Sequence, residues 1–223
     1  MTHPATAHLR NALYGRLWPL LIAVVVLNFG YPILSMAGGF GDLIYIAAYA
    51  LMLVLGIFVT GNDRVHVIRA GAFALLWFVL SLLVAAHPGN AALRIAQLAA
   101  LLPGLAIIIA SLARFIVEAR VVNGQVLISA ITIYVLLAVF FAPVYGLIET
   151  LAPGSFVDNG LGRPVQWQQL MYYSTVTLTT VGYGDILPLN PWARTLAALE
   201  SVTGVLYIAV LLGRLVGIYR QEK

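Results

Sequence analysis

The sequence predicts an all-α membrane protein with six transmembrane helices and one shorter re-entrant helix. Hydrophobic residues make up 62% of the 223-residue chain and charged residues only 9%, whereas soluble domains carry about 25% charged residues. Six apolar runs are close to the roughly 20 residues that a helix needs to cross a bilayer. The mean hydropathy of +0.98 is typical of helices that face lipid.

The expected spans lie near 17–36, 42–60, 70–86, 91–112, 124–148 and 192–217. A further apolar stretch at 165–178 is too short to cross, so we expect it to be buried in protein or to line a watery cavity. The polar residues 1–16 lead directly into the first span, so no separate cleavable signal peptide is expected. This order predicts an N-terminal four-helix membrane domain at 1–120 and a second domain at 121–223.

Basic residues indicate the orientation of the spans, because cytoplasmic loops of membrane proteins are enriched in Lys and Arg. With six spans both termini lie on one side, and that side carries nine basic residues against three on the other. The nine are Arg10, Arg16, Arg64, Arg69, Arg114, Arg120, Arg214, Arg220 and Lys223. We therefore expect a cell-membrane protein with both termini in the cytoplasm. Arginine outnumbers lysine eleven to one, which is typical of a prokaryotic source.

Between the re-entrant helix and the last span lies a short loop, Thr180-Val181-Gly182-Tyr183-Gly184, followed by Asp185. Its two glycines alternate with bulkier residues, and glycine reaches positive φ at little steric cost. Such a backbone can turn successive carbonyls toward one axis, where rings of carbonyl oxygens replace the water shell of a cation. The Val181 and Tyr183 side chains are then expected to point away from that axis, and Thr180 to add a ring of hydroxyls.

This loop resembles the selectivity filter of tetrameric potassium channels, and the resemblance extends over residues 121–219. It implies an outer helix at 124–148, a pore helix at 165–178, a filter at 180–185 and an inner helix at 192–217. It also implies a homotetramer in the lipid bilayer, because each chain supplies one of the four filter segments that close the ring. The implied K⁺ ligands are Thr180, Val181, Gly182 and Tyr183, and no other cofactor is expected.

The resemblance also implies that four residues support the filter: Tyr172, Tyr173, Thr177 and Thr179. The two tyrosines stand where many relatives carry paired tryptophans that hydrogen-bond to the filter, and a tyrosine hydroxyl can donate or accept one such bond. Simple aromatic packing explains the pair equally well. Val176 stands where some bacterial relatives have a carboxylate, so filter inactivation that depends on that acid is not expected.

The predicted inner helix contains Gly204, where the family often has a hinge glycine. A glycine inside a helix costs up to about 1 kcal/mol, so this one requires a reason, and hinge bending and close helix packing are both adequate. Four apolar residues recur at helical spacing and should share one face: Val205, Ile208, Leu212 and Val216. In the family that face lines the cavity and the gate, although ordinary apolar packing also accounts for it.

Glu200 is a charged residue about nine positions into the same helix, and a charge at that depth normally has a partner. The expected partners are pore-helix hydroxyls such as Ser174, and either a structural or a gating role is open. Glu149, Asp158 and Arg163 belong to the predicted outer loop, where we expect them to be solvated.

Composition and motifs narrow the function classes. The basic residues form no run that would suit nucleic acid, and the absence of cysteine excludes disulfides and thiolate metal sites. A potassium-selective channel is the favoured function. A less selective cation channel and a potassium transporter subunit are the alternatives, and no metalloprotease, serine-hydrolase or paired intramembrane aspartate motif indicates an enzyme. The opening stimulus is not indicated.

The charges predict weak voltage dependence, although the four N-terminal spans resemble a degenerate voltage sensor in number. Voltage-sensing helices carry an arginine at every third position, but Arg94 is followed at that spacing by Gln97, Ala100 and Pro103. Steep gating needs about three to four gating charges per subunit.

Overall fold

The computed structural model of the chain describes residues 4–30, 39–60, 64–160, 163–165 and 167–221, and most of them are helical. The helices are α1 (Pro4–Phe29), α3 (Gly39–Thr60), α4 (Arg64–Ala86), α5 (Ala91–Glu118), α6 (Gly124–Leu151), α7 (Trp167–Leu178) and α8 (Pro191–Gln221). The strands are β1 (Phe156–Asp158), β2 (Arg163–Pro164) and β3 (Ile186–Pro188), and they form one antiparallel sheet in the order β2-β1-β3.

Two sequence predictions need correction. The fold is mainly helical as predicted, but the small sheet was missed, because strands of two or three residues are too short to show an alternating pattern. The pore helix was expected to begin at Val165, directly after Pro164, whereas α7 begins at Trp167 and Pro164 belongs to β2. In addition, α1 ends at Phe29, and residues 31–36 of the predicted first span lie outside the described residues.

The number of membrane spans remains a prediction. Among the described residues, three helical segments are long and apolar enough to cross a membrane: Ala91–Glu118, Gly124–Leu151 and Pro191–Arg214. The described apolar segments Leu17–Phe29, Ile44–Ile57 and Gly71–Ala86 are shorter. The structure therefore agrees with a membrane protein.

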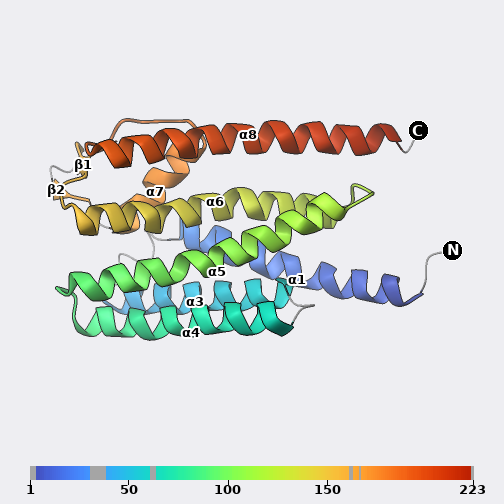
Figure 1. Cartoon of the computed structure of the whole chain (residues 1–223), viewed down its shortest axis with the longest axis horizontal. Coiled ribbons are helices and arrows are strands. Elements are labelled where there is room, and N and C mark those ends of the chain that lie inside the picture. The colour runs from blue at the N-terminus through green and yellow to red at the C-terminus, as the bar shows by residue number, and fades with distance from the viewer. Residues whose placement is uncertain (1–3, 31–38, 61–63, 161–162, 166, 222–223) are drawn as a thin grey trace.

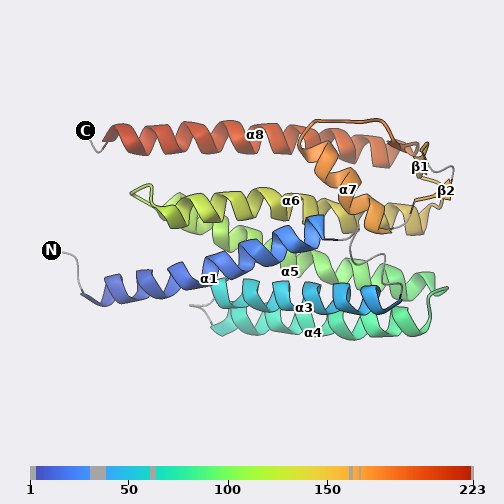
Figure 2. The same cartoon turned by 180° about the vertical axis from the view of Figure 1, so that it is seen from behind.

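The helices form one elongated bundle in which α6 stands between the two halves of the chain (Figure 1). In the N-terminal half, α1 packs on α3, α4 packs on α3 and α5, and both α1 and α5 pack on α6. On the other side of α6, the short α7 lies obliquely between α6 and α8. Figure 2 shows from behind that the sheet and α7 occupy one end of the bundle, while α1 begins and α8 ends toward the other.

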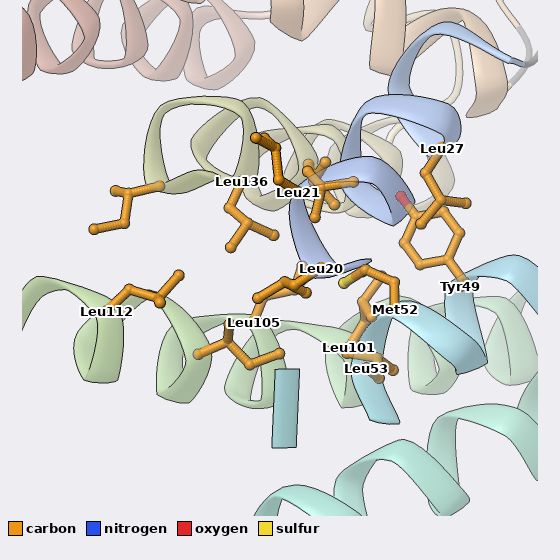
Figure 3. Close-up of a cluster of buried hydrophobic side chains, with 14 of the residues drawn as sticks. Leu20, Leu21, Leu27, Tyr49, Met52, Leu53, Leu101, Leu105, Leu112 and Leu136 are labelled. Carbon is orange, nitrogen blue, oxygen red and sulfur yellow. The ribbon is translucent and has the colours of Figure 1, made fainter. Parts of the chain in front are cut away.

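The main core joins α1, α3, α5 and α6, and Figure 3 shows its leucines meeting between these helices. Leu20, Met52, Leu105 and Leu136 are each completely buried. Lipid tails are as apolar as leucine, so this contact gains little hydrophobic free energy within a membrane. Close packing and hydrogen bonds hold such helices together instead. Met171 of α7 belongs to the same core, so this core extends to the pore-helix candidate.

Asparagines begin three of the helices. The Asn90 side chain accepts from the Leu93 N–H before α5, and the Asn123 side chain accepts from two N–H groups at the start of α6. Asn190 accepts from the Trp192 N–H, and Pro191 occupies the first helical position of α8, where its missing donor costs nothing. Each side chain satisfies donors that a helix start leaves unpaired, so these starting points are encoded locally.

Candidate selectivity filter and its supports

The backbone of the candidate filter alternates in handedness. Gly182 and Gly184 have φ of 57° and 76°, as expected from the glycines, and Thr180 has φ of 58°. In a regular strand, consecutive carbonyls point to opposite sides. Positive φ at every second residue reverses the direction of alternate peptide units, so consecutive carbonyls can face the same side. Thr180 is the unexpected member, because a β-branched residue at positive φ is a rare conformation that costs about 1–3 kcal/mol.

The end of α7 explains why Thr180 adopts this conformation. The Val181 N–H donates to the Val176 carbonyl and the Thr180 N–H donates to the Thr177 carbonyl, both at 3.0 Å. This pair of bonds is the Schellman motif, which ends a helix on one left-handed residue. Thr180 therefore serves as the helix cap and is also the first residue of the candidate filter. The Thr179 hydroxyl donates to the Thr175 carbonyl at 2.8 Å, which closes the last turn.

The C-terminal end of the candidate filter is attached to the small sheet. The Tyr172 hydroxyl donates to Asp185 Oδ2 at 2.7 Å, and the Asn159 N–H donates to the Asp185 carbonyl at 2.8 Å. Strand β3, which directly follows, pairs with β1, and Arg194 Nε donates to the Pro188 carbonyl at 2.9 Å. The Tyr172 bond is the contact that the resemblance implied.

Tyr173 has a different environment from Tyr172. Its ring lies edge-on to the rings of Tyr145 and Phe156, at centroid distances of 5.1 and 5.3 Å, and it is 6% exposed. These three aromatic residues belong to a second core cluster that also contains Ile186, directly after the filter. The two neighbouring tyrosines thus divide the implied role, since one bonds to the filter and the other packs behind it.

Helix α8 contacts the last turn of α7 through a narrow stripe. The buried residues on the described part of α8 are Ala193, Glu200 and Gly204. A Cβ added at Gly204 would lie 2.1 Å from the Leu178 carbonyl oxygen, and the Ser201 hydroxyl donates to the Thr177 carbonyl at 3.0 Å. Close packing therefore accounts for this glycine, while the hinge role remains a hypothesis that the structure does not require.

Glu200 has partners on two other helices. Its side chain is completely buried, the Tyr145 hydroxyl on α6 donates to Oε2 at 2.5 Å, and Ser174 Oγ on α7 contacts Oε1. Ser174 was one of the expected partners. Tyr145 was missed, because nothing in the sequence connects residues 55 positions apart. Glu200 thus connects α8, α6 and α7, which are the candidates for the inner helix, the outer helix and the pore helix.

The four predicted gate residues of α8 do not pack within this chain. Val205, Ile208, Leu212 and Val216 are between 44% and 56% exposed. Their neighbours Leu206 and Val210 are also exposed, so exposure alone does not distinguish a cavity-lining face from a lipid-facing one.

Both acids of the outer loop accept hydrogen bonds, and Asp158 is buried rather than solvated as predicted. Asp158 is 5% exposed and accepts from Gln169 Nε2 at 2.7 Å and from the Gly160 N–H at 2.9 Å. The Glu149 carboxylate accepts from the N–H groups of Gly154 and Phe156, at 2.8 and 3.0 Å. Both acids therefore shape the loop that positions β1 beside the filter. Nothing is described for the Arg163 side chain.

Comparison with known proteins agrees with the geometry of this half of the chain. Residues 126–221 match a family model described as an ion channel. The inward rectifier potassium channel Kirbac3.1 of Paramagnetospirillum magnetotacticum is 36% identical over 90 residues, which are 40% of this chain and 28% of that protein. The potassium voltage-gated channel protein shk-1 of Caenorhabditis elegans is 36% identical over 55 residues, 23% of this chain and 10% of that protein. The two-pore potassium channel 5 of Arabidopsis thaliana is 39% identical over 46 residues, 21% of this chain and 11% of that protein.

The family match, together with the short helix α7 and the alternating backbone of residues 180–184, makes the second half of the chain similar to an ion channel. More narrowly, the three relatives are all potassium channels, so the second half of the chain is similar to potassium channels. The chain spans less than a third of the length of each of these relatives. No solved structure shows a significant match to the chain.

Proposed function

We propose that this protein conducts K⁺ passively and selectively across a membrane through a pore shared by four chains. The observation that carries the proposal is the alternation of positive φ at Thr180, Gly182 and Gly184. Four such segments around one axis would supply the rings of carbonyls that replace the hydration shell of K⁺. The ligands in this proposal are Thr180, Val181, Gly182 and Tyr183, and K⁺ is the transported ion rather than a resident cofactor.

The structure also bears on the two alternatives. A channel that admits Na⁺ as readily would need a looser filter, whereas Tyr172, Asn159 and the β1–β3 pairing all hold the outer end of this one. A transporter with several filter segments in one chain is disfavoured, because the sequence contains a single such segment. A selective channel remains the better proposal.

The reversal potential of purified protein in a planar bilayer tests ion selectivity. With K⁺ on one side and Na⁺ on the other, we expect it to lie near the K⁺ equilibrium potential. A reversal potential near zero with both ions carrying current would identify a non-selective cation channel, and absence of current with retained ion uptake would identify a transporter.

The tetramer is expected from side chains that this chain leaves uncovered. Val181 and Tyr183 are 52% and 71% exposed in the single chain, although they follow a pore helix in a tightly bonded segment. Neighbouring copies around a fourfold axis would cover them, and cyclic symmetry is the simplest way to close such a ring. Native mass spectrometry in mild detergent should show four chains. Conducting protein that is only monomeric or dimeric would contradict a shared pore.

We further propose a prokaryotic cell membrane and an orientation with both termini in the cytoplasm. The start of α1 and the end of α8 both lie toward one end of the bundle, away from the candidate filter (Figure 1). Together with the excess of basic residues in loops on that side, this arrangement supports a filter near the outer surface. Val205, Ile208, Leu212 and Val216 would then line the cavity on the cytoplasmic side of the filter, where apolar rings can gate by dewetting.

Gating is expected to depend only weakly on voltage. Arg94 is the arginine of α5 nearest the outer end, and its guanidinium donates to the Pro88 carbonyl in the preceding loop at 3.5 Å. Gln97 lies three residues further along, where a voltage-sensing helix would carry its next arginine. Its side-chain amide donates a hydrogen bond to the Ser81 hydroxyl at 2.9 Å. Each charge that crosses the whole field contributes roughly 2.3 kcal/mol per 100 mV. The test is the steepness of open probability against voltage. A steepness that corresponds to more than about four gating charges per channel would contradict this expectation.

A further inference from the structure

The buried acid Glu200 lies in a chain of hydrogen bonds that determines where its proton resides. Its Oε2 accepts from the Tyr145 hydroxyl at 2.5 Å, and its Oε1 contacts Ser174 Oγ. Ser174 Oγ also donates to the Ala138 carbonyl on α6, at 2.9 Å. The chain of bonds therefore begins and ends on α6, and it passes through α8 and α7.

Counting hydroxyl protons decides between two charge states of Glu200. A serine hydroxyl has one proton to donate. If Ser174 donates it to the Ala138 carbonyl, the proton in the Ser174–Glu200 contact must belong to the carboxyl group. If Glu200 were ionised, Ser174 would have to donate to Oε1. The Ser174 hydroxyl oxygen and the Ala138 carbonyl oxygen lie 2.9 Å apart, and they would then face each other with no proton between them.

The surroundings of the carboxyl group also disfavour a charge. Glu200 is completely buried in a segment that is long and apolar enough to cross a membrane. Its partners in the described part of the chain are two neutral hydroxyls, with no basic side chain at ion-pair distance. An unpaired buried charge carries an effective penalty of several kcal/mol, whereas a neutral acid makes both hydrogen bonds at much lower cost.

We propose that Glu200 is a neutral carboxylic acid that donates its proton to Ser174 and thereby positions the pore helix. Each donor in the relay then has one acceptor: Tyr145 donates to Glu200, Glu200 to Ser174 and Ser174 to the Ala138 carbonyl. Ser174 lies one turn before Thr177, whose carbonyl accepts from the N–H of the first filter residue. The relay is therefore a positioning device for the filter. Only this last consequence rests on the proposed function.

Infrared difference spectroscopy on the purified protein tests the proton directly. The spectrum of wild type minus that of Glu200→Gln should contain the carbonyl stretch of a neutral carboxylic acid. Glu149→Gln is the matched control, because that carboxylate accepts from two backbone N–H groups and carries no proton to either. Its difference spectrum should lack the carboxylic-acid band that Glu200→Gln removes, and the amide bands of the new glutamine are common to both variants. Carboxylate bands lost in Glu200→Gln would overturn the proposal, whether or not the protein conducts K⁺.

The positioning role has a second test, in which the conservative variant should retain function. A glutamine amide donates to Ser174 and accepts from Tyr145 as the neutral acid does, so Glu200→Gln should keep the wild-type melting temperature and ion selectivity. Glu200→Ala leaves the Tyr145 and Ser174 hydroxyls without this partner and should reduce selectivity for K⁺ over Na⁺ by about tenfold. If the alanine variant matches wild type in both measurements, or the glutamine variant is as impaired as alanine, the positioning role is wrong.

Discussion

Gly182→Ala is expected to abolish potassium selectivity or conduction altogether. Gly182 has φ of 57°, and a Cβ in this left-handed conformation costs about 1–2 kcal/mol for an L-residue. Apart from the two adjacent residues, no atom of the described residues lies within 4 Å of the added methyl group, so the effect acts through the backbone rather than through a clash. The strain is relieved if φ becomes negative, which turns the neighbouring carbonyls away from the proposed pore axis.

The measurement is the reversal potential in opposing K⁺ and Na⁺ solutions, compared with wild type. Gly89→Ala is the matched control, because its added Cβ also meets nothing within 4 Å and its φ is not in the left-handed region. We expect the control to conduct and select as wild type does. If Gly182→Ala retains the wild-type reversal potential, the proposed ring of carbonyls does not include this residue.

Gly204→Ala is expected to loosen the contact between the inner helix and the pore helix. The added Cβ would lie 2.1 Å from the Leu178 carbonyl oxygen. That atom belongs to the backbone, so the helices must separate. Overpacking of this kind typically costs about 1–3 kcal/mol, which exceeds the gain of up to about 1 kcal/mol from replacing glycine in a helix. Because Leu178 is the last residue of α7, the displacement should reach the filter.

Gly213→Ala provides the control on the same helix, since its added Cβ meets nothing within 4 Å among the residues that the structure describes. Helix propensity then predicts equal or slightly higher stability for this variant. The melting temperature of the detergent-solubilised channel should fall for Gly204→Ala and not for Gly213→Ala. Equal melting temperatures, combined with altered opening only in Gly204→Ala, would favour the hinge hypothesis over close packing.

Local sequence patterns predicted the features that depend on short segments. The hydrophobic runs indicated the helices, because a span needs about 20 apolar residues wherever it lies in the fold. The alternation of glycine in residues 180–184 predicted positive φ at Gly182 and Gly184, which both glycines show. Asn90, Asn123 and Asn190 begin helices through their own side chains, a local signal that the sequence predictions did not use.

The tertiary structure alone decided the features that depend on distant contacts. Asp158 looked like a solvated loop acid, and its burial arises from Gln169 on α7 and from strands too short for a pattern. The reason for Gly204 lies in the carbonyl of Leu178, and the partner of Glu200 on α6 lies 55 positions away. Composition and spacing record which residues suit a helix, a turn or a filter. They do not record which two helices meet, because that depends on how all the helices pack at once.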